Sequence, residues 1–317
     1  MNDIWRPLLA RYGTALAALL LFLFFAATAS NFLAIGNLLG IAKHISHIAI
    51  LGIGFSLALI AAELDLSFAN VCSLAAVTTG LLVHRGYAPE LAVLAGLAIG
   101  VGCGFANGLI VTMLKVPSLI ATLALAAIAN GVAFLLTDGV SVVGRWPAGF
   151  VGIGRGALFG VPALVWWMAI VAILAWVFIA QTRTGFRLVC TGEQLNAARL
   201  AGLPVRRLKL LAMTLSGGAA GLAAVLLTAS LSSAAPNMAG DFLLTAIAAV
   251  LLGMTMFQPG HANIPGTLVG ALTIGMLGNG LVLLGAPYYV QDICLGFIII
   301  GSVALSASVL TRAAFEV

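Results

Sequence analysis

The sequence is a succession of apolar stretches, most of them close to the roughly 20 residues that an α-helix needs to cross the hydrocarbon core of a bilayer. Only 7% of the residues are charged and 62% are hydrophobic, whereas soluble globular domains carry about 25% charged residues. This composition excludes an ordinary soluble enzyme. It predicts an all-α, polytopic membrane protein in which residues 1–317 form one transmembrane domain.

About ten spans are predicted, since a chain of this length has room for about that number and little else. The first run follows Arg6 and Arg11, and no charge-rich mature domain comes after it, so it is predicted to be a span rather than a cleaved signal peptide. The predicted spans cover approximately residues 12–29, 41–62, 66–83, 91–114, 119–136, 161–180, 210–231, 242–257, 267–284 and 289–310.

The net charge of +5 has a local origin. Residues 181–209 hold six basic residues and one acid, Glu193, and the rest of the chain is balanced. By the positive-inside rule this segment is cytoplasmic. Counting spans from a cytoplasmic start then places Lys115, His261 and Arg312 on the same side, with both termini cytoplasmic. The excess positive charge is explained by the cytoplasmic location of this segment, so it does not indicate a nucleic-acid partner.

A short helix is predicted inside the basic segment. Residues 195–200 form helix readily and are followed by Gly202 and Pro204, which end helices. The run is too short to span, and residues 182–209 are therefore predicted to form a cytoplasmic segment that fits a groove of another protein. The alternative is a solvated charged loop, which would not need the small-residue face of Ala197, Ala198, Ala201 and Gly202.

No catalytic constellation or metal site is predicted. The four histidines offer no HExxH spacing, the four cysteines no CxxC pair, and no Gly-x-Ser-x-Gly turn occurs. None of the three lysines lies in a phosphate-binding P-loop. If ATP drives this protein, a separate subunit must hydrolyse it.

Two acids interrupt the apolar runs near the second and third spans. Glu63 and Asp65 have two interpretations: a proton or cation site, or a structural role in which Asp65 or Ser67 caps the next helix. The structural role is favoured, because a cap is needed where one run gives way to the next.

Amide side chains also occur within the predicted spans. Asn107, Asn130 and Asn279 are candidates for a polar path through the membrane, with interhelical hydrogen bonding as the competing and favoured role for most of them.

Two further features of the sequence are a long loop on the outer side of the membrane and a helix with a face of glycines. Residues 139–160 are predicted to form a periplasmic loop, in which Arg145 and Arg155 are either solvated or contact an acidic partner outside. Glycines recur every fourth residue from Gly96 to Gly108, which predicts close packing of that helix against another.

Several separated segments carry short motifs: residues 63–67, 116–123, 182–185, 196–202, 248–253, 266–271 and 279–281. In the order and spacing of these motifs, and over nearly its whole length, the chain resembles the permease subunits of ribose and related monosaccharide ABC importers. It departs from that family in residues 253–260, where a Gly-Gly-Thr-Ser run is common, at Asn196, where an acid is usual, and at Glu193, where a glycine is usual. These departures leave open whether the solute is a sugar, a sugar alcohol or a furanosyl signal molecule.

The resemblance implies a location in the bacterial inner membrane, a pore formed with a second permease copy or a paralogue, an ATP-binding ABC subunit below it and a periplasmic solute-binding protein above it. ATP with magnesium would bind the ATPase subunit, and no cofactor would bind this chain. The resemblance also implies that the basic segment docks into the ATPase, through Arg187, Gly192, Glu193, Asn196, Ala197, Ala198, Arg199, Ala201 and Gly202.

Two other classes of protein remain open. An ion-coupled secondary transporter would use Glu63 and Asp65, and a membrane component with a structural or assembly role would explain the packing glycines but not the basic segment.

Overall fold

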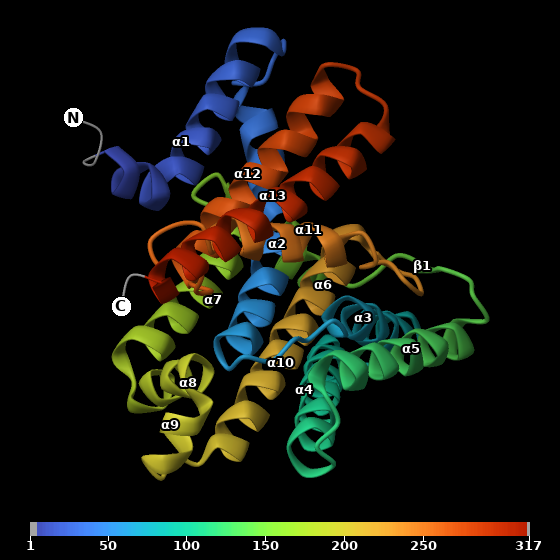
Figure 1. The fold of residues 1–317 in the computed structure, drawn as a ribbon. Coiled ribbons are helices and arrows are strands. Elements are labelled where there is room, and N and C mark those ends of the chain that lie inside the picture. The colour runs from blue at the N-terminus through green and yellow to red at the C-terminus, as the bar shows by residue number, and fades with distance from the viewer. Residues whose placement is uncertain (1–4, 316–317) are drawn as a thin grey trace. The chain divides into compact units, whose positions relative to one another are not determined.

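The computed structural model describes residues 5–315, and the side-chain surroundings of residues 14–304 (Figure 1). Within this range the chain is mainly helical and contains two short two-stranded sheets. Its helices are α1 (Trp5–Thr28), α2 (Ile35–Ile60), α3 (Phe68–His84), α4 (Pro89–Met113), α5 (Ser118–Thr137), α6 (Ala148–Arg155), α7 (Ala163–Gln181), α8 (Arg183–Glu193), α9 (Leu195–Leu200), α10 (Val205–Leu231), α11 (Phe242–Gly253), α12 (Ile264–Leu283) and α13 (Tyr288–Phe315). Its strands are β1 (Val142–Val143), β2 (Ala157–Leu158), β3 (Val161–Pro162) and β4 (Ser233–Ala234).

The apolar runs predicted from the sequence all fall on helices, which confirms the helical class. Within the described range, six helices are long and apolar enough to cross a membrane: α2, α4, α5, α7, α10 and α12. Four further apolar helical stretches are shorter, at Thr14–Thr28, Phe68–His84, Phe242–Gly253 and Tyr288–Ala304. The long helices are thus fewer than the predicted spans. Helices α3 and α11 have 17 and 12 residues, below the length of a typical span, and the apolar stretches described within α1 and α13 are short as well.

The chain divides into two compact units, one formed by Ile53–Leu243 and the other by Met1–Gly52 with Leu244–Val317. The long helix α2 contributes residues to both.

The glycine face of α4 packs against α10 within the unit Ile53–Leu243, and the two helices run alongside each other in Figure 1. A β-carbon at Gly100 would overlap the backbone of Gly217 and Gly221, and one at Gly104 would overlap the carbonyl of Met213. Glycines on both helices therefore let the two backbones touch. This confirms the close packing predicted from the glycine spacing.

The predicted loop at residues 139–160 is partly folded. Strand β1 pairs antiparallel with β4, and the buried ring of Phe150 on α6 joins a core cluster with Trp146 and Val225. Arg155 donates from Nε to the carbonyl oxygen of Ser230 at 2.6 Å. Aromatic burial and this bond therefore fix the segment onto α10.

The other unit packs α1 and α11 against α12. Gly280 on α12 lies against the ring of Phe25, and Gly270 lies against the backbone of Ala249 on α11. Asn37 and Asn279 exchange two amide hydrogen bonds, of 3.0 and 2.9 Å. Small residues again bring helices together, and the asparagine pair joins α2 to α12.

Candidate functional site

The centre of the candidate site is the non-helical segment at residues 61–67, which joins α2 to α3 and is called here the α2–α3 segment. Its residue Asp65 accepts three hydrogen bonds: Oδ1 from the backbone N–H of Ser67 at 2.9 Å and from its Oγ at 2.6 Å, and Oδ2 from Oγ of Ser216 at 2.7 Å. Asn107 on α4 donates to the Ser67 hydroxyl at 2.8 Å. These four side chains are at most 1% exposed and form one continuous network.

The capping role predicted for Asp65 and Ser67 is correct only in part. Asp65 accepts the N–H of Ser67, the residue just before α3, whereas the Ser67 side chain makes no cap bond to that helix. The reason is that the Ser67 hydroxyl is already used, because it donates to Asp65 and accepts from Asn107. The carboxylate thus ties the start of α3 to α10, through Ser216.

Glu63 in the same segment forms an ion pair with Lys209 on α10. The side chains are 7% and 17% exposed, so each charge is largely withdrawn from water and depends on the other. Lys209 therefore attaches the first turns of α10 to the α2–α3 segment.

Helix α5 holds the backbone of the α2–α3 segment from another side. The N–H of Leu64 donates to Oγ of Ser118 at 3.1 Å, and the N–H of Leu66 donates to Oγ1 of Thr122 at 3.2 Å. Extended backbone has no internal partners for its N–H groups, and these hydroxyls supply them. The segment is thereby fixed in shape.

The predicted cytoplasmic segment, residues 182–209, folds as α8, α9 and the start of α10. Thr182 caps α8 by accepting the N–H of Gly185 at 2.9 Å. Helix α9 covers Leu195–Leu200 and is followed by Gly202 with a φ of +73°, which confirms the predicted short helix and its end.

Contact between this segment and α2 is made by Gly192. Its α-carbon lies so close to Ile60 that a β-carbon added at Gly192 would overlap the carbonyl oxygen of Ile60. The same β-carbon would lie 3.2 Å from the backbone N of Ala62. A motion of α8 must therefore move the end of α2 or break this contact, because neither backbone can yield locally.

Most residues predicted to dock into a partner are accessible. Ala198, on the inner side of α9, is buried and Gly192 is half-buried, whereas the remaining predicted residues are exposed: Arg187, Glu193, Asn196, Ala197, Arg199, Ala201 and Gly202. The segment thus presents a largely solvent-exposed outer surface and anchors its inner surface to the rest of the unit.

The predicted path residues are distributed unevenly. Asp65, Ser67 and Asn107 come together, whereas Asn130 lies further along α5 with its carbonyl oxygen buried and without a partner in the described part of the chain. Asn279 is engaged with Asn37, as expected of an interhelical hydrogen bond. Asn107 also keeps an unused buried acceptor, Oδ1, among the residues described.

The predicted outside residues differ in their surroundings. Arg145 and Arg155 are both exposed, but Arg155 already donates to the carbonyl oxygen of Ser230, whereas Arg145 makes no hydrogen bond or ion pair among the described residues.

Sequence reasoning missed Ser216 and Lys209 as members of the site. Ser216 stands before two glycines in an apolar helix, and the sequence offers no base partner that would mark it as functional. Lys209 was counted only as part of the basic segment, although it is one of three lysines in the chain and lies just inside an apolar helix. A lysine followed directly by an apolar run predicts an acidic partner, and Glu63 was available.

Within residues 14–304, no group of three His, Cys, Asp or Glu side chains is arranged to hold a metal ion. The buried network instead consists of hydroxyl, amide and carboxylate groups in contact with apolar helices. Together with the long apolar helices, this network indicates a multi-pass membrane protein with polar groups buried between its helices.

The family follows from comparison with known proteins. Residues 37–303 match the family model described as "Branched-chain amino acid transport system / permease component", and the chain belongs to this family. The ribose import permease protein RbsC of Escherichia coli (strain K12) is 37% identical over 292 residues, covering 90% of each chain. RbsC of Bacillus subtilis (strain 168) is 32% identical over 270 residues, covering 85% of this chain and 84% of the relative.

A relative with another named solute matches equally broadly. The autoinducer 2 import system permease protein LsrC of Salmonella choleraesuis (strain SC-B67) is 31% identical over 293 residues, covering 92% of this chain and 84% of the relative. A solved ABC transporter of metal-chelate type in an inward-facing conformation aligns over 96% of this chain and 99% of its own, with 14% identity and a TM-score of 0.49. The resemblance to sugar importer permeases found in the sequence is confirmed by the curated relatives.

Proposed function

We propose that this chain forms the translocation path of an ATP-driven importer for a monosaccharide or a similar small polyol. The support is the breadth of the match to relatives named for ribose and autoinducer 2 import, which extends over most of each chain. Asn107 and Asn130 are the proposed path residues: their amide oxygens are buried without a partner among the described residues, and a conformation that opens a path beside them would offer these acceptors to a solute hydroxyl group.

The proposed topology has about ten crossings and both termini in the cytoplasm. It rests on the six long helices with the four shorter apolar stretches, and on the concentration of positive charge in residues 181–209. The segment 139–160 then faces the periplasm, where exposed Arg145 and Arg155 are available to a solute-binding protein with acidic patches.

The chain is proposed to work with an ATP-binding ABC subunit, a periplasmic solute-binding protein, and a second permease that is either a copy or a paralogue. ATP and magnesium belong on the ATPase subunit, and no catalytic residue or cofactor is assigned to this chain. Closure of the ATPase pair would displace the segment 182–209 and shift the pore between outward-open and inward-open states.

One observation carries the coupling role. The segment 182–209 and the adjoining turns of α10 reach the α2–α3 region at three points: Gly192 at Ile60, Lys209 at Glu63, and Ser216 at Asp65. All three contacts lie within one compact unit, so displacement of the docking surface is transmitted to the start of α3 without a flexible step.

The same contacts disfavour the ion-coupled alternative. Glu63 is paired with Lys209, and Asp65 accepts three hydrogen bonds, so both carboxylates hold neighbouring elements together. An ion-coupled cycle would require one of these carboxylates to leave its buried partners in every turnover, which is costly.

The test is a gentle-detergent purification of the tagged chain from its native host, followed by uptake measurements with radiolabelled ribose in proteoliposomes. We expect a P-loop ATPase to co-purify in stoichiometric amount and uptake to require ATP and the binding protein. A chain that purifies alone and drives uptake from an ion gradient without ATP would contradict the proposal.

A further inference from the structure

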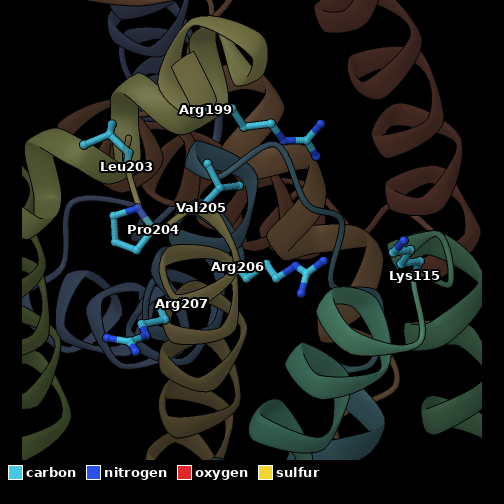
Figure 2. Close-up of a pocket in the computed structure, with 7 residues that line it drawn as sticks. All are labelled: Lys115, Arg199, Leu203, Pro204, Val205, Arg206 and Arg207. Atoms are coloured by element: carbon cyan, nitrogen blue, oxygen red, sulfur yellow. The ribbon is translucent and has the colours of Figure 1, made fainter. Parts of the chain in front are cut away.

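A cavity of about 620 Å³ lies at the corner between α9 and α10 and reaches the connection between α4 and α5. Its basic residues are Lys115, Arg199, Arg206 and Arg207, and the apolar residues 203–205 complete the lining. In Figure 2 the guanidinium groups of Arg199 and Arg206 extend toward the side where Lys115 lies, whereas Arg207 points away. A second cavity of about 330 Å³ shares Lys115, Arg199 and Arg206 with the first.

The positive charge of these cavities is not compensated within the described part of the chain. Glu63 is the acid that lines the second cavity, and it is already paired with Lys209. The structure shows no ion pair for Lys115, Arg199 or Arg206 among the residues it describes. Three cations around one cavity repel each other unless an anion binds between them.

Exposed apolar side chains border the same cations. Met113 and Leu114, which directly precede Lys115, are 68% and 71% exposed, and Leu200, which follows Arg199, is 91% exposed. Exposed apolar side chains contribute no binding energy to a small hydrated anion. A ligand with a phosphate group and long apolar chains satisfies both parts of this surface.

The position of the cavity fits a ligand from the bilayer. It lies at the ends of α4 and α10, two of the long apolar helices, and therefore at the depth where the hydrocarbon core gives way to headgroups. Basic residues at this depth attract anionic lipids.

We propose that this cavity binds the phosphate headgroup of an anionic phospholipid from the leaflet that surrounds the segment 182–209, with Lys115, Arg199 and Arg206 as its ligands. The acyl chains lie along Met113 and Leu114. A lipid bound there joins the α4–α5 connection to the α9–α10 corner, and so stabilises the position of the docking segment. The proposal does not depend on which solute is transported.

The test uses the purified full chain in detergent, titrated with phosphatidylglycerol or phosphatidylcholine and followed by native mass spectrometry. We expect phosphatidylglycerol to bind at least tenfold more tightly than phosphatidylcholine, and a Lys115→Gln/Arg206→Gln variant to lose about tenfold or more of that affinity. Arg183→Gln is the matched control, because Arg183 is an exposed cation of the same segment that does not line the cavity. The control is expected to bind phosphatidylglycerol like the wild type.

Three outcomes would overturn the proposal. The first is equal affinity for the two lipids. The second is full displacement of phosphatidylglycerol by millimolar inorganic phosphate, which would assign the cavity to a free anion. The third is unchanged lipid binding in the double variant together with loss of the co-purifying ATPase, which would make the cavity a protein contact. Correct folding of the variant is checked by its elution as a single symmetric peak and by circular dichroism.

Discussion

Lys209 and Glu63 are separated by 146 positions in the sequence, yet their side chains form an ion pair that is largely shielded from water. The pair joins the beginning of α10, next to the docking segment, to the α2–α3 segment. Removing one partner leaves the other charge in a poorly solvated position, which is more costly than losing the pair as a whole.

The first prediction concerns this pair. Glu63→Gln and Lys209→Gln should each lower stability by roughly 3 kcal/mol, because each leaves an unpaired, largely buried charge. The double variant Glu63→Gln/Lys209→Gln should lose less than the sum, because it removes both charges. Thermal unfolding in detergent gives the ranking, and additive losses in the double variant would show that the two side chains act independently.

The second prediction concerns Ser216. Ser216→Ala should lower stability by about 1 to 3 kcal/mol, because Oδ2 of the buried Asp65 loses its hydroxyl donor. Ser46→Ala is the control: Ser46 is equally buried, but its hydroxyl donates to the carbonyl of Ala42 within its own helix. Equal melting temperatures for the two variants would argue against a special role of the Asp65 network.

The third prediction concerns Gly192. In Gly192→Ala the added methyl group overlaps the carbonyl oxygen of Ile60, so α8 must shift away from α2. We expect transport in proteoliposomes to fall at least tenfold while the ATPase still co-purifies and hydrolyses ATP. Gly40→Ala has free space around the new methyl group and should transport normally.

The fourth prediction concerns Gly202. Gly202→Glu places a bulky anion at an exposed position with a φ of +73°, a backbone conformation that costs a side-chain-bearing residue about 1 kcal/mol. We expect the variant, and deletion of residues 195–200, to insert into the membrane but to lose transport and the co-purifying ATPase. Wild-type uptake in either variant would rule out a docking role for α9.

The fifth prediction concerns the contact between α4 and α10. Gly100→Ala should destabilise the protein by about 1 to 3 kcal/mol, because its methyl group overlaps the backbone of Gly217. Gly102→Ala, in the same helix with no atom within 4 Å of the new carbon, should be neutral or slightly stabilising. Thermal unfolding of the two variants in parallel provides the comparison.

Much of the helical architecture was predictable from the sequence, because the signals are local. Apolar runs placed the long helices, Gly202 and Pro204 marked the end of the short helix α9, and the glycine spacing of α4 marked its contact face. Neighbouring residues decide whether a segment forms a helix and which of its faces can approach another helix. The lengths were less certain: α11 ends at Gly253, before the predicted residue 257.

The composition of the site was decided by tertiary structure alone. The sequence identified Glu63, Asp65, Ser67 and Asn107 as unusual residues, but not Lys209 and Ser216 as their partners. Such pairs join residues about 150 positions apart, and their meeting depends on how the α2–α3 segment packs against α10. The sequence thus determined that polar groups must be satisfied inside an apolar protein, and only the packing of the helices decided which groups satisfy them.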